Sequence, residues 1–593
     1  MRPSVLGLAG ILLVCVLAVA LRSVPAAESP HLFGFDPYVH YYFAGYAVEH
    51  GRIAPMDGFQ GGLEDDRAYW PGLHVLAGGT EAVTGASRLA VFRSLPQLLG
   101  TLTVLLVFLL ARRMFGTAPA LVAALLYAVA DHSVFQSSWL VQETLGIMLL
   151  VAFLFVLTQL GPVRRWEGAV LLVILYAASL ASHHFSHAIL LATFLLAAYV
   201  TPKRDVRDGL LRMFALLLPL TLLWWVGFGG RTGSFPDIAH RVLGVVGSQV
   251  GVALIWVVVA ALALDLWLGR RLGSLLACTK ARALRWARWL DRGGGRLSVF
   301  GILALLITSA TLLAYERVFS PIPGLGAQQA TKYVLTAFGA VGAATLVARG
   351  DPSARLLLGL SALLAIGLAM VMFVLTFLPL QLRFFDYIYI PLAILSGVGV
   401  VRFSRTSSIV EAVGPGWTAI ITGGARNHRV IMSTVLVSLV LMIAVEAIAV
   451  DDYGRATGPL AMRYYHSDAE FEAARWIHDN AEPDAYICAP FGVQPVVYAF
   501  GERRTDIVVV SRCLEGGSWE SAAHEIQMFA QHGPTYIYLT TDTSKYGENE
   551  LQTYGLEYVY HVGGTFLQYP MVFEFKYHND ETIILKVNLE GVG

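Results

Sequence analysis

Charged residues are scarce in this sequence. Only 14% of its 593 residues are Asp, Glu, Lys or Arg, whereas a soluble protein carries roughly a quarter. Long apolar runs recur along the first three quarters of the chain, and the mean hydropathy is +0.61. Apolar runs of about 18 or more residues are typical of transmembrane helices. The low charge therefore excludes a soluble globular protein and predicts a polytopic α-helical membrane protein.

Cysteine is also scarce, with four residues and neither a CxxC nor a zinc-binding pattern. Cysteine-based metal or redox chemistry is therefore excluded as the main activity. Cys15 lies in an apolar run and Cys278 in a basic loop, so these two are not expected to meet. Cys488 and Cys513 share the C-terminal part and could pair if that part is extracellular.

The apolar runs predict thirteen spans. They cover residues 4–21, 93–111, 117–130, 138–160, 166–182, 185–200, 209–228, 242–268, 297–315, 333–348, 355–378, 385–401 and 430–449. The first could instead be a signal peptide, because Arg2, an apolar core and the sequence VPAAE fit that template. We favour a retained span, which makes residues 1–449 a multi-spanning membrane domain.

The connections between these spans alternate in character. One set is basic, from ARRMFG at 111–116 to the arginines of 402–429, and the other is richer in His, Asp and aromatic residues. The second set includes a long first loop, 22–92, and a fifth loop, 316–332. Because basic loops stay in the cytoplasm, we expect a cytoplasmic N-terminus and an extracytoplasmic C-terminal part.

Residues 450–593 are predicted to form a separate α/β domain outside the membrane. They carry 21 of the 42 acidic residues but only 9 of the 42 Lys and Arg. Ser467 and Glu470 have the spacing of a capping box, and Phe471, Ala474 and Ile477 share one helical face. Short β-rich runs at 506–510 and 535–540, with a helix at 518–530 between them, complete the pattern.

Unusual polar residues fall on the predicted outer side. They are Asp36, His74 in the stretch YWPGLH, Asp131, Glu143, His183, His184, His187, Lys332 and Arg383. Acids in outer loops are usually solvated, and the histidines could cap or pack at the interface. The histidines could also bind a metal, although HHxxH lacks the zinc-protease spacing. Glu143 lies within a span, where an ionisable group is functional by default.

Asp36 has a more specific setting. Pro37 disfavours a helical conformation for the residue before it, which places Asp36 at the start of a helix over YVHYYFAGYAVEH. A carboxylate at a helix N-terminus is favourable. We expect the ring-rich face of this helix to lie on the membrane surface. Asp36 would then stand at the outer boundary, where a lipid-linked substrate presents its head group.

Three stretches of the sequence carry a family resemblance. DPYVHYYFAGYAVEHG followed by YWPGLH, then LQLRFFDY at 380–387, and EFEAARWIHDNAEPDAYI at 470–487 resemble the GT-C glycosyltransferases. The strongest likeness is to the oligosaccharyltransferase catalytic subunit and its archaeal relatives. The resemblance implies a membrane domain of about 13 helices, long first and fifth outer loops and an outer C-terminal domain.

The resemblance also implies roles for individual residues. Asp36 matches the first-loop acid that contacts the acceptor and, in metal-using members, Mn²⁺ or Mg²⁺. Asp131 lies where the second acidic motif is expected, and Arg383 matches the arginine that binds the donor phosphate. Lys332 could assist Arg383 in neutralising that phosphate.

The sequence departs from the oligosaccharyltransferase pattern in three places. His132 follows Asp131 where a second acid is expected, and the fifth loop has Gln328 and Gln329 but no acid near its end. The acceptor motif WWDYG is absent, and DDYG at 451–454 lies too close to the last span to replace it. We therefore expect too few carboxylates for a firm divalent-cation site.

These features predict a membrane glycosyltransferase that uses a polyprenyl- or dolichyl-phosphate sugar donor. Its acceptor would be a glycan, lipid or protein, and no nucleic-acid partner is expected. Protein N-glycosylation by an oligosaccharyltransferase proper is an alternative. A lipid or solute transporter is another, although no internal repeat is present and transporters bind substrate between repeats. A receptor or scaffold on the same fold is a third.

Overall fold

The computed structural model describes about half of the chain. The described residues are 5–34, 36–53, 70–159, 165–201, 204–227, scattered residues within 335–364, 378–405, 466–489, 493–501, 503–506, 533–540, 573–580 and 582–588. The predicted spans 242–268, 297–315 and 430–449 lie outside these residues, as do Cys513 and the predicted helix at 518–530.

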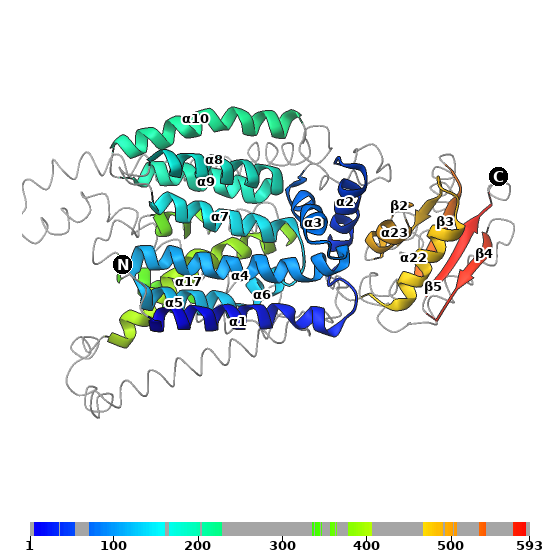
Figure 1. The fold of residues 1–593 in the computed structure, drawn as a ribbon, viewed down its shortest axis with the longest axis horizontal. Coiled ribbons are helices and arrows are strands. Elements are labelled where there is room, and N and C mark those ends of the chain that lie inside the picture. Colours follow the sequence, from blue (N-terminus) through cyan, green and yellow to red (C-terminus); the bar gives the residue numbers. More distant parts are fainter. Residues whose placement is uncertain are drawn as a thin grey trace, which may run out of the picture.

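Long helices form a bundle in which successive helices run in alternating directions (Figure 1). They are α1 (Val5–Glu28), α4 (Arg88–Phe115), α5 (Thr117–Val129), α7 (Gln142–Gln159), α8 (Arg165–Ser182), α9 (His184–Val200), α10 (Arg204–Gly227) and α17 (Leu378–Arg405). Each corresponds to a predicted span. Among the described residues, α1, α4 and α7 are long and apolar enough to cross a membrane by themselves.

Shorter helices gather at one end of this bundle. They are α2 (Asp36–His50), α3 (Gly72–Thr84) and α6 (Asp131–Gln136), and the C-terminal elements lie at the same end (Figure 1). We call this the site end. The end of α4, with Arg112 and Arg113 in its last turn, and the start of α10 at Arg204 lie at the opposite end (Figure 1). The helices therefore keep the two predicted classes of loop apart.

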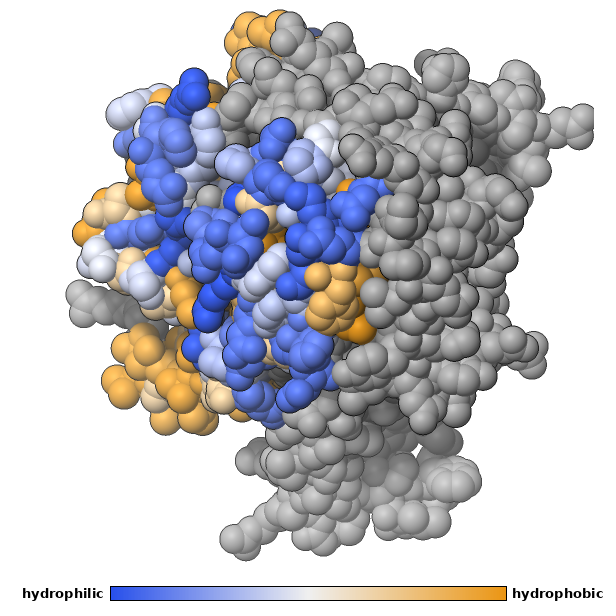
Figure 2. All heavy atoms as spheres, turned by 90° about the vertical axis from the view of Figure 1, so that its right-hand side faces the viewer, coloured by the Kyte–Doolittle hydropathy of each residue, from blue (hydrophilic) through white to orange (hydrophobic). Residues whose placement is uncertain are grey.

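The C-terminal elements form a mixed sheet with helices packed on it. The helices are α22 (Asp468–Asn480) and α23 (Gln494–Gly501). The strands are β1 (Tyr486–Cys488), β2 (Arg504–Asp506), β3 (Thr535–Thr540), β4 (Phe573–His578) and β5 (Thr582–Val587), in the order β2-β1-β3-β5-β4. Strand β1 is parallel to β2 and β3, whereas β5 is antiparallel to β3 and β4. These elements present a mainly hydrophilic surface (Figure 2), as expected outside a membrane.

The predicted start of α22 is confirmed. Ser467 accepts the Glu470 N–H, and the Glu470 side chain accepts the Ser467 N–H, which completes the capping box. Phe471, Ala474 and Ile477 are all buried. Strand β3 coincides with the predicted run at 535–540, and β2 covers only the first residue of the run predicted at 506–510.

Several predicted boundaries are wrong. Helix α4 begins at Arg88 rather than 93, α10 at Arg204 rather than 209 and α17 at Leu378 rather than 385. Helix α1 continues past residue 21 to Glu28 because Arg22, which looked like a flanking charge, is fully buried among other helices. The span predicted from 138 begins only at Gln142. The residues before it instead form helix α6 and a turn, in which Trp139 packs against Gly34.

The environment predicted for helix α2 is also wrong. Its rings do not form a face on a membrane surface but pack against α23. Tyr42 lies 4.3 Å from Tyr498 and Tyr41 lies 5.6 Å from Phe500, measured between ring centroids. The aromatic surface that suggested a lipid interface is therefore an interface within the protein, because another apolar surface is available to cover it.

Candidate functional site

Asp36 is the first residue of α2 and lies at the site end, as predicted. Gly34 precedes it with φ +90°, and a Cβ there would lie 2.2 Å from the Trp139 ring. A glycine is required at this position both for the positive φ and for the close approach. The segment that leads into Asp36 is thereby packed against the turn that follows α6.

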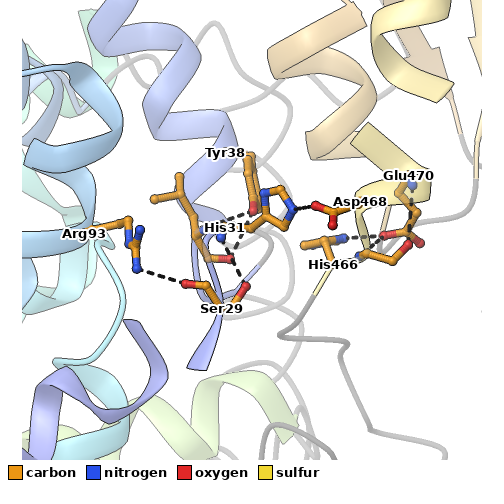
Figure 3. Close-up of polar contacts among 9 residues, drawn as sticks. Ser29, His31, Tyr38, Arg93, His466, Asp468 and Glu470 are labelled. Carbon is orange, nitrogen blue, oxygen red and sulfur yellow. Dashed lines mark hydrogen bonds and ion pairs between the residues drawn. The ribbon is translucent and has the colours of Figure 1, made fainter. Parts of the chain in front are cut away.

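The same segment is tied to the C-terminal elements. His31 Nε2 lies 2.7 Å from Asp468 Oδ1 (Figure 3). The His31 ring stacks on the Phe471 ring, with centroids 3.8 Å apart. Tyr38 donates to the carbonyl of Leu32 and accepts its N–H, at 3.1 and 3.0 Å. Burial raises the pKa of Tyr38 well above its usual value. Its hydroxyl therefore stays protonated and can donate the hydrogen bond to the Leu32 carbonyl.

A second contact continues this interface. The Tyr38 ring meets the edge of the His466 ring at 5.2 Å, and His466 Nδ1 lies 3.0 Å from Glu470 Oε2 (Figure 3). Both side chains of the His466–Glu470 pair are fully buried. Because the Glu470 carboxylate also caps α22, this interface fixes α2 relative to the start of α22. Asp36 is thus held by residues far away in the sequence.

His74 lies in α3 and is buried against α2. Its Nε2 is 2.9 Å from Nδ1 of His40, so one of the two rings donates to the other. Gly72, two residues earlier, packs closely on α8, since a Cβ there would lie 2.6 Å from Ser182 Oγ. Within the stretch YWPGLH, the described residues therefore fasten α3 to the bundle, and His74 occupies a packed position rather than an open one.

Asp131 is the first residue of the short helix α6. This helix is held by Arg22 of α1, which is 0% exposed. The Arg22 guanidinium donates to Ser133 Oγ at 3.0 Å, to Ser137 Oγ at 2.6 Å and to the carbonyl of Ala128 at 3.0 Å. A buried cation is costly unless its donors are satisfied, and these contacts satisfy most of them. They also fix the helix that begins with Asp131.

Glu143 and the predicted histidines bind to one another and to other helices. Glu143 Oε1 lies 3.4 Å from His183 Nε2, and His183 caps α9 by accepting the Ser186 N–H. His184 packs on Trp70 at 5.4 Å between ring centroids, and His187 Nε2 lies 3.1 Å from Thr221 Oγ1. The His183 and His184 rings also contact each other, with centroids 4.8 Å apart. Among the residues that the structure describes, the three histidines belong to no group of three His, Cys, Asp or Glu side chains that could hold a metal ion.

Arg383 lies within the first two turns of α17, which packs against α5 and α6. The helix carrying Arg383 therefore neighbours the helix that begins with Asp131, and the segment before Asp36 packs on the turn after α6. Lys332 lies outside the described residues. Helices α2 and α6 lie at the site end, and α17 runs along the bundle beside α6 (Figure 1).

The metal prediction can be tested against the donor set. Among the residues that the structure describes, no three His, Cys, Asp or Glu side chains are grouped as a cation would require. Divalent Mn²⁺ and Mg²⁺ need several oxygen ligands. Asp36 and Asp131 alone do not make a complete site.

Comparison with known proteins identifies the fold. Residues 71–226 match the family model described as dolichyl-phosphate-mannose-protein mannosyltransferase. The oligosaccharyltransferase AglB from Archaeoglobus fulgidus, solved with an inhibitory peptide and a dolichol-phosphate, is similar over 99% of this chain and 74% of its own, with a TM-score of 0.56 and 15% identity. The fold is that of the GT-C membrane glycosyltransferases.

Other solved forms of the Archaeoglobus fulgidus oligosaccharyltransferase agree. The form tethered to an acceptor peptide containing the NVT sequon gives a TM-score of 0.56 and 15% identity, over 97% of this chain and 73% of its own. The complex with Zn and sulfate gives 0.53 and 15%, over 97% and 72%. No curated protein sequence matches the chain. The GT-C likeness predicted from three short stretches is thereby confirmed.

Sequence reasoning missed several residues that organise this end of the GT-C fold. They are Arg22, His31, Ser186, Tyr387 and His466. Arg22 followed an apolar run and resembled an ordinary flank. Ser186 and Tyr387 lie 201 positions apart, and no local pattern could connect them. The one sequence feature that could have indicated these residues is that small and polar side chains occur next to the apolar helices at this end.

Proposed function

We propose that this protein is a membrane glycosyltransferase that moves a sugar or oligosaccharide from a polyprenyl-phosphate-type carrier to an acceptor on the outer face of the membrane. The observation that carries the proposal is the packing, within a GT-C bundle, of α17, which carries Arg383, against α6, which begins with Asp131. Asp36 begins α2 at the same end of the bundle as α6. It is supported by the archaeal oligosaccharyltransferase of the same fold, which was solved with a dolichol-phosphate.

The proposed chemistry requires few groups. The acceptor loses a proton to the Asp36 carboxylate, and its oxygen or nitrogen forms a bond to the anomeric carbon of the sugar. The bond from that carbon to the donor phosphate oxygen breaks, and the electron pair leaves with the phosphate. Arg383, assisted by Lys332, neutralises the charge that develops there. Asp131 lies on the neighbouring helix and contributes a second carboxylate.

A divalent cation would be bound by Asp36 and Asp131 and would share the neutralisation of the phosphate. The Archaeoglobus enzyme was solved with Zn. This supports testing whether transfer depends on Mn²⁺ or Mg²⁺. The small number of carboxylates leads us to expect transfer that survives EDTA. Complete loss of activity on chelation, restored by Mn²⁺, would instead favour an oligosaccharyltransferase proper.

Arg383→Lys tests the donor site. The substitution keeps the positive charge but loses the two parallel hydrogen bonds that a guanidinium offers to a phosphate. With a polyprenyl-monophosphate hexose as donor, we expect the donor KM to rise about tenfold or more, a cost of about 1.4 kcal/mol. Arg113→Lys, at the opposite end of the bundle, is the matched control.

Three outcomes would count against the proposal. Equal donor use by the parent and Arg383→Lys would reduce Arg383 to a membrane anchor. Movement of intact lipid-linked sugar across vesicles without any transfer would favour a transporter. Absence of transfer together with retained binding of the carrier would favour a receptor or scaffold on the same fold.

A further inference from the structure

A chain of buried polar side chains runs between three helices close to Arg383. It joins Glu143 of α7, His183 and Ser186 at the start of α9, and Tyr387 of α17. Glu143 Oε1 lies 3.4 Å from His183 Nε2, His183 Nδ1 lies 2.8 Å from Ser186 Oγ, and Ser186 Oγ lies 2.5 Å from the Tyr387 hydroxyl. The helices that it joins are far apart in the sequence, so the chain is a tertiary feature.

The contacts give this chain a direction. The Ser186 N–H donates to His183 Nδ1 at 3.3 Å, so Nδ1 carries no proton and the ring proton lies on Nε2. His183 Nε2–H therefore faces Glu143 Oε1 at 3.4 Å, and the Ser186 hydroxyl donates to His183. The Ser186 oxygen is then free to accept from Tyr387. The Ser186 hydroxyl thus has both a donor and an acceptor role, and the Tyr387 hydroxyl is the donor at the end of the chain.

The helices are built closely around this chain. Ser186 and Tyr387 are 0% exposed, and Glu143 is 8% exposed. Gly146 of α7 faces Ser186 so closely that a Cβ would lie 2.0 Å from Ser186 Oγ. Polar groups buried at this depth are costly unless their geometry is kept. The chain of hydrogen bonds therefore restricts the position of α17 relative to α9.

Tyr387 lies four residues after Arg383 in the same helix. Residues spaced by four lie on one helical face, about 6 Å apart along the axis. Beyond Tyr387, α17 is packed by apolar residues such as Ile388, Ile390 and Leu392, and apolar packing alone fixes rotation less sharply than a hydrogen bond. The Tyr387 hydroxyl is a buried polar contact one turn from Arg383, and Ser396 makes another farther along α17 with the Leu335 carbonyl at 2.6 Å.

We propose that Tyr387, held through Ser186 and His183 by Glu143, is a positioning residue that aims Arg383 at the donor phosphate. This inference rests on the proposed function and adds to it a role for Glu143 and His183, which the transfer chemistry does not use. It also explains why a carboxylate and a histidine are kept inside the apolar bundle, since the pair anchors the chain that Tyr387 completes.

The test is a double-mutant cycle between Tyr387→Phe and Arg383→Lys. A positioning residue acts through its partner, so the two losses are not additive. In the parent, Tyr387→Phe should raise the KM for a polyprenyl-monophosphate hexose about tenfold with a smaller change in kcat. In the Arg383→Lys background, the same substitution should cost less than about twofold, because the guanidinium that it aims is gone.

Tyr176→Phe is the matched control. Tyr176 is another fully buried tyrosine whose hydroxyl bonds across helices, to Thr221 and to the Leu217 carbonyl of α10. It lies on α8, away from α17, so its loss should leave the donor KM within about twofold. An equal effect of Tyr387→Phe in both Arg383 backgrounds, or an effect no larger than that of Tyr176→Phe, would overturn the inference.

A second variant and a second measurement guard against misfolding. Ser186→Ala breaks the same chain while keeping Tyr387, and should reproduce the rise in KM. Thermal stabilisation of the detergent-solubilised protein by polyprenyl monophosphate, without sugar, reports donor-site binding directly and should weaken in both variants. If the parent transfers sugar and Arg383→Lys impairs it while both chain variants match the parent, this inference alone fails. If the parent neither transfers sugar nor is stabilised by the phosphate, the proposed function fails as well.

Discussion

The two ends of the helix bundle are built differently. At the opposite end, apolar side chains of α1 and α8 are exposed, with Val5 85% and Trp166 71% exposed, and the arginines lie at the surface. At the site end, Arg22, Glu143 and His183 are buried and hydrogen-bonded. Apolar contacts are tolerant of small shifts, whereas buried hydrogen bonds are not. We infer from this difference that the opposite end tolerates small shifts of its side chains. The site end must instead hold its buried polar side chains in fixed positions.

The largest expected difference between the ends concerns carboxylates near helix starts. Asp36→Asn removes the proposed proton acceptor and should reduce transfer about 100-fold or more. Asp208→Asn is the control, because Asp208 lies near the start of α10 at the opposite end and, among the described residues, pairs with Arg204 and Arg207 at the surface. Steady-state transfer rates measure both. Asp36→Asn activity within twofold of the parent would remove Asp36 from the mechanism.

The next comparison is between two arginines. Arg22→Met leaves Ser133, Ser137 and the Ala128 carbonyl without their donor, at about 1–3 kcal/mol for each group that stays unsatisfied. The thermal midpoint of the detergent-solubilised protein should therefore fall clearly. Arg113→Met, at an exposed position, should change the free energy of unfolding by less than about 0.5 kcal/mol. If Arg22→Met and Arg113→Met lower the stability equally, the buried hydrogen bonds of Arg22 contribute no more to it than an exposed arginine does.

Two glycines give a third matched pair. Gly146→Ala introduces a Cβ 2.0 Å from Ser186 Oγ, whereas Gly209 of α10 has open space around it. Overpacking should cost Gly146→Ala about 1–3 kcal/mol of stability, together with a rise in the donor KM. Gly209→Ala should be stabilising by about 0.5–1 kcal/mol, as for alanine in a helix interior. Thermal melts and donor titrations distinguish these outcomes, and a neutral Gly146→Ala would contradict the close packing described for Ser186.

The smallest effect is expected from a polar network at the surface of the C-terminal sheet. Partial burial would raise the pKa of Glu482, but contacts with Lys586 and Tyr536 outweigh it and hold the pKa at about 2. The Glu482 charge therefore contributes fully to the free energy of unfolding above pH 4.5, and this contribution is lost as the pH falls toward 2. Because the Glu482–Lys586 pair is only partly buried, Glu482→Gln should cost less than about 1 kcal/mol.

Hydrogen exchange of β3 and β5 measures the Glu482→Gln difference. The gap between the parent and the variant should shrink as the pH is lowered through this range. A gap that stays constant down to pH 2 would show that the Glu482 charge contributes nothing to the stability of the sheet.

Much of this architecture followed from periodicity and composition. The helices, their alternation and the start of α22 depend on residues close in sequence, since apolar runs and capping boxes act within a few turns. Asp36 was placed at a helix start because Pro37 acts on its immediate neighbour. The separation of basic loops from polar ones needed only the order of the spans.

Tertiary structure decided where the polar groups find their partners. The aromatic face of α2 could pack against a membrane or against protein, and the sequence pattern is the same in both cases. Its packing against α23 is visible only in the tertiary structure. Arg22 reads as a flanking charge until Ser133 and Ser137 surround it. Tyr387 gains its role from Ser186, which lies 201 residues earlier. Burial and hydrogen bonding between distant segments depend on the whole packed bundle, and a local sequence pattern contains no information about it.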